Sequence, residues 1–321
     1  MEMYSGIKIL AGTASKDLAN EISTYLNEAI CEHDVIVFPN ENVFVRLRKS
    51  VRGQDVYVIQ TTSTPVNQNL MELLITLQTL KLDSAGRITA VVPYLCYARS
   101  DKKDQPRVPI TARLVADMVQ VAGADRYIVL DLHAGQIQGF FSIPGDVLTA
   151  FHLLSGYFVE RRDQLKDPVI VAADLGFSKK GRNFAATLGC SMAFIEKRRS
   201  SNDPAAEALT IIGDVANHDV IIVDDEVATA GSMVQAVNIV KAHGALDVYM
   251  CFVHPVLSGT AAERLAALPL KQIVTTNTVP ITPEKRAVLG DRLVVLSVAP
   301  LLGEVIRRAH EGRSVGEMFN E

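Results

Sequence analysis

The segment VIIVDDEVATAGSMVQAV, residues 220–237, changes its pattern twice along its length. Four β-branched residues, 220–223, predict a short strand that is buried on both faces of a sheet. Two carboxylates and a run of small residues follow, and apolar residues then recur at helical spacing over 231–242. A strand that passes through a short turn into a helix is the repeating unit of α/β folds. The segment therefore predicts an α/β protein.

The same alternation of β-branched runs and helix-period segments extends along the whole chain. Predicted strands cover residues 7–11, 35–38, 55–59, 88–92, 127–130, 169–173, 220–223, 246–252 and 272–276. Predicted helices cover residues 16–28, 70–80, 110–122, 181–188, 231–242 and 261–268. The 321 residues exceed the size of a single core, about 250–300 residues. We predict two similar domains, 1–145 and 146–321, each a mostly parallel sheet flanked by helices.

The composition excludes several classes of protein. Hydrophobic residues make up 48% of the chain, charged residues 21%, and the formal net charge is −4. This balance gives no reason to expect nucleic acid as a partner. The four cysteines are scattered without metal-ligand spacing, and no apolar run reaches about 18 residues. We expect a soluble cytoplasmic protein that binds neither nucleic acid nor a membrane.

The turn after the 220–223 strand is suited to a phosphorylated sugar. Its small residues are Ala228, Thr229, Ala230, Gly231 and Ser232. Backbone N–H groups with so little side-chain bulk around them can approach a phosphate, and the helix N-terminus adds partial positive charge. Asp224 and Asp225 can accept hydrogen bonds from the vicinal hydroxyls of a ribose. An acid-rich helix cap would explain one carboxylate but not two, so we predict that these seven residues bind ribose 5-phosphate.

Polar side chains also follow the other predicted strands. Ligands in open α/β sheets bind beyond the carboxyl ends of the strands. The residues at such ends include Ser63, Thr64, Tyr97, Arg99, Asp131, His133, Asp174 and His254. We expect them to form one polar crevice. The 224–232 loop itself resembles the phosphoribosyl-diphosphate loop of the type I phosphoribosyltransferase superfamily, whose fold both halves are expected to share.

A second motif narrows the resemblance. DLHAGQIQGFFSIPGD, residues 131–146, is similar to the divalent-cation signature of ribose-phosphate pyrophosphokinases. A lone histidine is more often structural, but the place of His133 in this match favours a metal ligand. Ser142 and Gly145 depart from the family pattern, which has an aspartate and an aliphatic residue there. Further segments resemble the family in order: 51–74, 88–119, 122–127, 195–200, 254–265 and 296–306.

The resemblance implies a reaction and a set of residues for it. The diphosphate of ATP, or of another nucleoside triphosphate, would pass to the anomeric hydroxyl of ribose 5-phosphate, giving phosphoribosyl diphosphate and AMP. Mg²⁺ would bridge the triphosphate, with His133 and Asp174 as its protein ligands. Lys197 and Arg199 would be the catalytic cations that offset the charge developing on the phosphates. Without the resemblance, Lys197, Arg198 and Arg199 would be taken for a solvated basic patch.

The nucleotide side of the expected site departs most from the family. The residues that the resemblance assigns to the nucleotide are Phe38, Asn40, Asn42, Arg99, Ser100 and Asp101. Glu41 stands where the family usually has glycine, Asn42 where it has glutamate, and Ser100 where it has glutamine. An amide both donates and accepts hydrogen bonds whereas a carboxylate only accepts, so we hypothesise a relaxed base preference. Because adenine contacts in the family come from a neighbouring subunit, the resemblance also implies a homo-oligomer built from dimers, up to a hexamer.

Other departures are milder. The family usually has a Gly-Gly-Val-x-Arg-Ala-Arg stretch where this chain reads LGFSKKGR, residues 175–182, and Ala228 replaces a third aspartate. Gln68 replaces another aspartate. Two alternatives to an active synthetase remain open: a non-catalytic homologue that regulates active subunits, and a phosphoribosyltransferase. The presence of His133, Asp174 and the Lys197-x-Arg199 pair favours the active enzyme.

Overall fold

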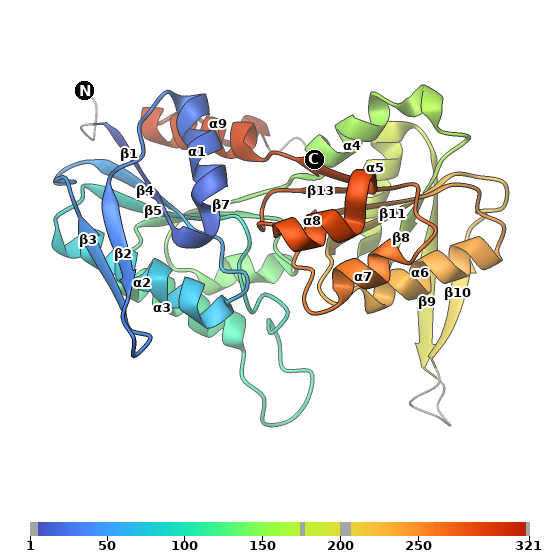
Figure 1. Cartoon of the computed structure of the whole chain (residues 1–321), viewed down its shortest axis with the longest axis horizontal. Helices are drawn as coiled ribbons and strands as arrows, with labels where there is room; N and C mark the ends of the chain where they lie inside the picture. The colour runs from blue at the N-terminus through green and yellow to red at the C-terminus, as the bar shows by residue number, and fades with distance from the viewer. Residues whose placement is uncertain (1–5, 174–176, 200–206, 319–321) are drawn as a thin grey trace. The chain divides into compact units, whose positions relative to one another are not determined.

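The computed structural model describes residues 6–173, 177–199 and 207–318, with the backbone alone at 197–199, 207–209 and 317 (Figure 1). The chain forms two compact units. Unit 1 contains the described residues up to Thr149, Thr278–Pro280 and those from Ser297 onward, and unit 2 contains Ala150–Asn277 and Ile281–Leu296. Among the described helices, none is both long and apolar enough to cross a membrane.

Unit 1 is built on a five-stranded parallel sheet. Its strand order is β1 (Ile7–Ala11), β4 (Asp55–Ile59), β5 (Arg87–Val92), β6 (Arg126–Leu130) and β7 (Gly145–Leu148). Its helices are α1 (Lys16–Leu26), α2 (Val66–Leu82), α3 (Thr111–Ala122) and α9 (Ala299–Glu311). The helices α1 and α9 pack together on one face of the sheet, and α2 and α3 on the other (Figure 1). Alternate residues of each strand therefore enter two separate cores.

A two-stranded antiparallel ribbon, β2 (His33–Val37) and β3 (Val43–Leu47), stands apart from that sheet. The sequence prediction placed residues 35–38 among the parallel strands, and this is wrong. The β-branched letters indicate a strand but not its partner. The apolar residues Ile36 and Val37 are 40% and 49% exposed, because the ribbon does not bury them within its own unit.

Unit 2 is built on a seven-stranded sheet. Its strand order is β10 (Glu207–Ile212), β9 (Ser191–Arg199), β8 (Val169–Ala172), β11 (Val220–Glu226), β12 (Val248–His254), β13 (Gln272–Thr276) and β14 (Leu293–Leu296). All neighbouring strands pair in parallel except β9 and β10. Its helices are α4 (Phe151–Val159), α5 (Ser178–Leu188), α6 (Gly231–Ala242), α7 (Ala261–Ala266) and α8 (Pro283–Leu289). The helices α4 and α5 pack together, as do α6 and α7.

The predicted fold class is confirmed, but several elements escaped the pattern. The 3₁₀ helices among the described residues are Thr13–Ser15, Gly135–Phe140, Arg162–Gln164, Gly290–Arg292 and Gly316–Met318. The prediction missed β3, β7, β9, β10, β14, α4, α8 and α9. The strands β7 and β14 have only four residues each, and β9 ends in charged residues. The helix α4 reads FHLLSGYFV, which is apolar nearly all round and lacks a helical stripe.

A buried polar network fixes α9 to the sheet of unit 1. The Asp55 carboxylate, which is fully buried, accepts hydrogen bonds from Arg87 Nε at 2.8 Å and Nη2 at 2.6 Å. It also accepts from the Tyr57 hydroxyl at 2.9 Å and from His310 Nδ1 at 2.8 Å. Arg87 donates in addition to the Ala309 carbonyl at 3.0 Å. Burial, with the Asp55 charge beside it, raises the pKa of Tyr57, so the phenol remains a donor at ordinary pH.

We expect the Asp55→Asn variant to lower the free energy of unfolding by about 3 kcal/mol, because it leaves the Arg87 charge buried without its partner. Urea unfolding followed by circular dichroism measures this difference. The control is Asp117→Asn, which removes an exposed ion pair with Arg113 on α3 and should cost about 0.5 kcal/mol or less. Equal effects of the two substitutions would show that the buried network does not anchor α9.

Candidate active site

The predicted ribose 5-phosphate loop joins β11 to α6 in the centre of the unit 2 sheet. The strand β11 runs on to Glu226, so Asp224 and Asp225 are still part of it. Asp224 pairs with Phe252 of β12, and Glu226 with His254. Asp225 and Glu226 are 6% and 5% exposed, whereas Asp224 is half-buried. Pairing with β8 ends at Val223, but pairing with β12 continues to Glu226, so the loop begins on a segment that the sheet holds from one side.

Neighbouring backbone holds this loop in place. The carbonyls of Val227 and Ala228 accept hydrogen bonds from the N–H groups of Leu257 and Ser258, at 2.9 and 2.8 Å. Arg264 Nη1 donates to the Thr229 carbonyl at 3.2 Å. Ala230 then adopts a left-handed backbone, φ 62°, as the N-cap of α6. Because the carbonyls are engaged on one side, the first N–H groups of α6, which have no intrahelical acceptors, are available to a ligand.

Gly231 leaves open space at the start of α6. A β-carbon placed there would come no closer than 3.8 Å to the Thr229 Oγ1, outside its chain neighbours and its own helix. The backbone of Gly231 lies outside the left-handed region, so its conformation does not require glycine. The missing side chain therefore leaves room beside the N–H groups, which is the room that a phosphate needs.

The predicted metal residue His133 lies in unit 1, just beyond β6. Asp131 turns the chain there with a left-handed backbone, φ 40°, and is 3% exposed. Thr149 Oγ1 donates to its carboxylate at 2.9 Å, and the Asp131 N–H donates to the Leu148 carbonyl at 2.9 Å. The strained turn is thus pinned to the end of β7, and His133 is exposed beyond it.

No cluster of three potential metal ligands occurs within the residues that the structure describes. Mg²⁺ usually keeps several waters and binds through one or two protein ligands together with substrate phosphates. An exposed His133 at a strand end fits such an open site. Asp174, the other predicted ligand, lies outside the described residues.

The two departures in the cation signature have local explanations. A β-carbon at Gly145 would lie 2.1 Å from the Tyr127 ring, so the ring occupies the space of the missing side chain. Tyr127 also stacks on Phe141, with ring centroids 3.9 Å apart. At Ser142 the chain is held by its backbone, because the N–H groups of Ser142 and Ile143 both donate to Gln120 Oε1. The side chain of Ser142 is exposed.

The predicted nucleotide residues fall in two places in unit 1. Phe38, Asn40 and Asn42 form the turn of the β2–β3 ribbon, where the Phe38 N–H donates to the Asn42 carbonyl at 2.9 Å and the Asn42 N–H to Asn40 Oδ1 at 3.3 Å. Glu41 has a left-handed backbone, φ 67°, which explains why glycine suits this position. Phe38 is 46% exposed.

The residues Arg99, Ser100 and Asp101 follow β5. Ser100 is engaged by α3: its Oγ accepts the Thr111 N–H at 3.2 Å, and its carbonyl accepts the Ala112 N–H at 3.1 Å. Asp101, 7% exposed, accepts a hydrogen bond from Gln136. This last contact brings the Arg99–Asp101 turn against the cation signature. Arg99 is exposed.

Lys197 and Arg199, the predicted catalytic cations, lie on β9, and their backbones pair with Leu209 and Glu207 of β10. The sequence prediction placed them at the start of a loop, but the strand continues to Arg199. Their side chains lie outside the described part of the structure, as do residues 200–206.

Family comparisons agree along the whole chain. The model of the N-terminal domain of ribose phosphate pyrophosphokinase matches residues 7–123, and that of the phosphoribosyl synthetase-associated domain matches 202–320. The ribose-phosphate pyrophosphokinase of Aquifex aeolicus is 44% identical over 98% of this chain and 99% of its own length. That of Caldanaerobacter subterraneus is 45% identical over 98% of each chain. The chain belongs to the ribose-phosphate pyrophosphokinase family.

A solved structure of the family supports the fold. The phosphoribosylpyrophosphate synthetase of Mycobacterium smegmatis superposes with a TM-score of 0.90 at 42% identity, covering 96% of this chain and 100% of that one. The predicted resemblance to the pyrophosphokinase family is therefore confirmed. Full-length membership also favours the catalytic interpretation over the regulatory one and over a phosphoribosyltransferase.

Proposed function

We propose that this protein transfers the diphosphate of ATP, or of another nucleoside triphosphate, to the anomeric hydroxyl of ribose 5-phosphate. The products are phosphoribosyl diphosphate and AMP. The observation that carries the proposal is the β11–α6 loop, which combines two strand-end carboxylates with open space at Gly231, in a chain that belongs to the family over its full length.

The acceptor sugar binds along this loop. Its phosphate lies at the start of α6, where the N–H groups of Gly231 and Ser232 and the hydroxyls of Thr229 and Ser232 can donate to it. The ribose hydroxyls donate to Asp224, the more exposed of the two carboxylates. Asp225 accepts the Glu226 N–H at 2.8 Å and stiffens the loop. Ala230 adds no side chain that would compete for this space.

Diphosphate transfer requires positioning and positive charge more than a strong nucleophile. The anomeric oxygen forms a bond to the β-phosphorus while the bond from that phosphorus to the bridging oxygen of the α-phosphate breaks, and AMP leaves. Lys197 neutralises the charge that develops on the reacting phosphates, and Arg199 offers its planar fork of donors to phosphate oxygens. Bound Mg²⁺, held by His133 and Asp174, would supply further charge neutralisation to the triphosphate.

The nucleotide base meets an altered recognition surface. Asn42 offers both a donor and an acceptor where a carboxylate would only accept. Ser100, whose hydroxyl already accepts the Thr111 N–H, cannot replace the reach of a glutamine. These features support a relaxed preference among bases.

Incubation with Mg²⁺, ribose 5-phosphate and a nucleoside triphosphate should release the nucleoside monophosphate. If the base preference is relaxed, GTP and CTP should be used at rates similar to that of ATP, whereas a site specific for adenine would use ATP alone. Chromatography of the nucleotides measures each rate.

Lys197→Ala should lower kcat by about 10²-fold or more, because it removes charge needed in the transition state, and excess EDTA should stop the reaction. No monophosphate from any triphosphate would favour the regulatory alternative, and strict ATP use would refute the relaxed base preference.

The Gly231→Ala substitution should separate binding from folding. Its methyl group meets no protein atom closely, so the free energy of unfolding should change by about 1 kcal/mol or less. The same methyl occupies the phosphate space, so KM for ribose 5-phosphate should rise about tenfold or more. Steady-state kinetics and urea unfolding measure the two effects. Gly156→Ala on α4, whose β-carbon meets no atom within 4 Å, is the control: it should leave KM unchanged and raise the free energy of unfolding by about 1 kcal/mol or less. An unchanged KM for Gly231→Ala would show that the phosphate of ribose 5-phosphate does not bind at this loop.

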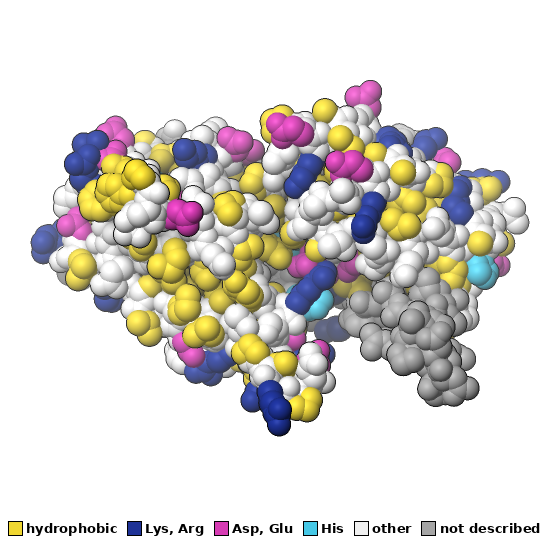
Figure 2. Space-filling model, turned by 60° about the horizontal axis from the view of Figure 1, so that its bottom comes forward, with side chains coloured by type: hydrophobic (Ala, Val, Ile, Leu, Met, Phe, Trp, Pro, Cys, Tyr) yellow, Lys and Arg dark blue, Asp and Glu magenta, His cyan; other side chains and the backbone are white. Residues whose placement is uncertain are grey.

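We also propose a homo-oligomer built from dimers, up to a hexamer. Hydrophobic side chains gather in broad patches on the visible face of the molecule (Figure 2). Large apolar residues that are at least 40% exposed occur on the ribbon and on the α2–α3 side of unit 1: Ile36, Val37, Phe38, Phe44, Met71, Leu82, Leu114 and Val121. Exposed apolar patches of this kind mark protein interfaces. Light scattering that gives the 34.9 kDa of a single chain at micromolar concentration would contradict the proposal.

A cytoplasmic location and a division into domains 1–145 and 146–321 remain predictions.

A further inference from the structure

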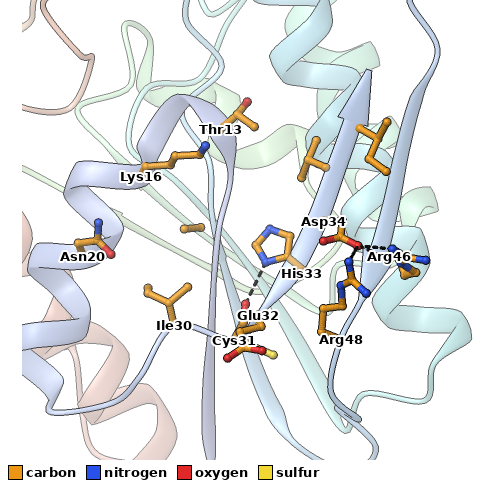
Figure 3. Close-up of a pocket in the computed structure, with 13 residues that line it drawn as sticks. Thr13, Lys16, Asn20, Ile30, Cys31, Glu32, His33, Asp34, Arg46 and Arg48 are labelled. Atoms are coloured by element: carbon orange, nitrogen blue, oxygen red, sulfur yellow. Dashed lines mark hydrogen bonds and ion pairs between the residues drawn. The ribbon is translucent and has the colours of Figure 1, made fainter. Parts of the chain in front are cut away.

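A cavity in unit 1 is lined by none of the residues assigned to the sugar, the nucleotide or the metal, although Phe38 follows its lining residue Ile36 by two positions on the ribbon. It measures about 650 Å³ and opens between the first turns of α1 and the β2–β3 ribbon (Figure 3). Ala11 places it beyond the carboxyl end of β1, the edge where α/β sheets bind ligands. Two strands separate β1 from β6, so the cavity is roughly 14 Å from the end of β6 along the sheet. Its volume is that of an ordinary small-molecule site.

One wall of the cavity carries a preassembled pair of guanidinium groups. Asp34 Oδ2 accepts hydrogen bonds from Arg46 Nε at 2.9 Å and Nη2 at 2.7 Å, and lies 2.7 Å from Arg48 Nη2. Both arginine side chains converge on this one carboxylate (Figure 3). Each guanidinium has five N–H donors, so a single carboxylate leaves most of them for another acceptor. Asp34, Arg46 and Arg48 together carry a net charge of +1, and the shared carboxylate holds both guanidinium groups in place.

The opposite wall carries a cation where helix physics disfavours it. Lys16 is the first residue of α1, at the positive end of the helix dipole, where acidic residues are stabilising. Asn20 lies one turn later, and both side chains point toward the cavity (Figure 3). Within the part of the chain that the structure describes, neither side chain has a recorded hydrogen bond or ion pair. Asp17 in the same turn supplies the negative charge that the helix dipole favours, so the Lys16 ammonium can serve as a donor to a ligand on this wall.

His33 stands between the two walls (Figure 3). Its Nδ1 lies 2.9 Å from the Cys31 carbonyl, which can only accept, so Nδ1 carries the hydrogen and Nε2 is left to face a ligand. Ile30 and Val35 add apolar surface to the same cavity. The lining therefore combines converging donors with a patch suited to a small organic group.

We propose that this cavity binds a small phosphate-bearing anion. Lys16, Arg46 and Arg48 grip the phosphate from two sides, and three cations face two carboxylates, Glu32 and Asp34, along the lining. A tetrahedral dianion can accept hydrogen bonds from both guanidinium groups at once while the Lys16 ammonium on the opposite wall adds electrostatic attraction. Ile30 and Val35 contact the organic part when the ligand is a phosphate ester.

Protection of Lys16 from acetylation tests the proposal at this site alone, independently of phosphate binding in unit 2. The full-length protein is treated with an amine-acetylating reagent at increasing concentrations of inorganic phosphate or phenyl phosphate, and peptide mass spectrometry gives the rate at each lysine. Both compounds should slow Lys16 acetylation at least about fivefold with saturation. Lys49, 67% exposed and outside the cavity, should keep its rate. If phenyl phosphate protects Lys16 at lower concentrations than inorganic phosphate does, the site binds a phosphate ester. If the two compounds protect Lys16 at equal concentrations, the site binds free phosphate.

Two variants complete the test. Arg48→Met removes one fork and leaves the Asp34–Arg46 pair, so the concentration needed to protect Lys16 should rise about tenfold, the loss of one charge-assisted hydrogen bond. Lys81→Met removes an exposed cation that lies outside the lining and pairs with Asp125 instead of a cavity residue, so it should change nothing. The proposal is overturned if Lys16 is acetylated equally fast with and without both compounds, or if Arg48→Met leaves the protecting concentration unchanged.

Discussion

Parallel pairing of strands buried on both faces is the constraint on which the proposed chemistry depends. All seven residues of β12 are buried, and the first four residues of β11 are buried beside them. Strands that are buried on both faces form backbone hydrogen bonds only with the neighbouring strands of their sheet. Because these strands are parallel, the polar residues at their carboxyl ends lie at the same edge of the sheet. That register sets Asp224 beside Phe252 and Glu226 beside His254. A carboxylate placed on a strand loses little freedom when it binds a sugar hydroxyl, because the sheet has already fixed it.

Left-handed backbones occur beyond several of these strand ends. Tyr97 after β5, Asp131 after β6 and Ala230 before α6 all have left-handed backbones. Such a conformation costs of order 1 kcal/mol for a residue with a side chain, and it persists where surrounding contacts determine it. Asp131 shows how: its carboxylate and its N–H are both bound at the end of β7. The strained turns are therefore held by the sheet, and they present the candidate site residues beyond it.

Several departures from the family pattern can be related to the contacts or the backbone conformation at that position. Gly145 has no side chain because the Tyr127 ring fills that space. Ser100 has become a partner of α3 rather than a long polar arm. Glu41 keeps the left-handed turn that glycine would adopt more easily.

The sequence by itself determined the fold class and the family, and it predicted the ribose-phosphate loop at 224–232 and the metal site at His133, because period, turn chemistry and motif spacing are local. It could not determine which strands are partners. The ribbon β2–β3, the β9–β10 pair and the return of α9 to unit 1 all depend on contacts between distant residues, such as His310 with Asp55. The cavity at Lys16 depends on them too, since its walls come from α1, β2 and β3. Bringing distant residues together costs loop-closure entropy, which the local sequence pattern does not indicate. Such contacts form only where complementary side chains offset that entropy in the folded protein.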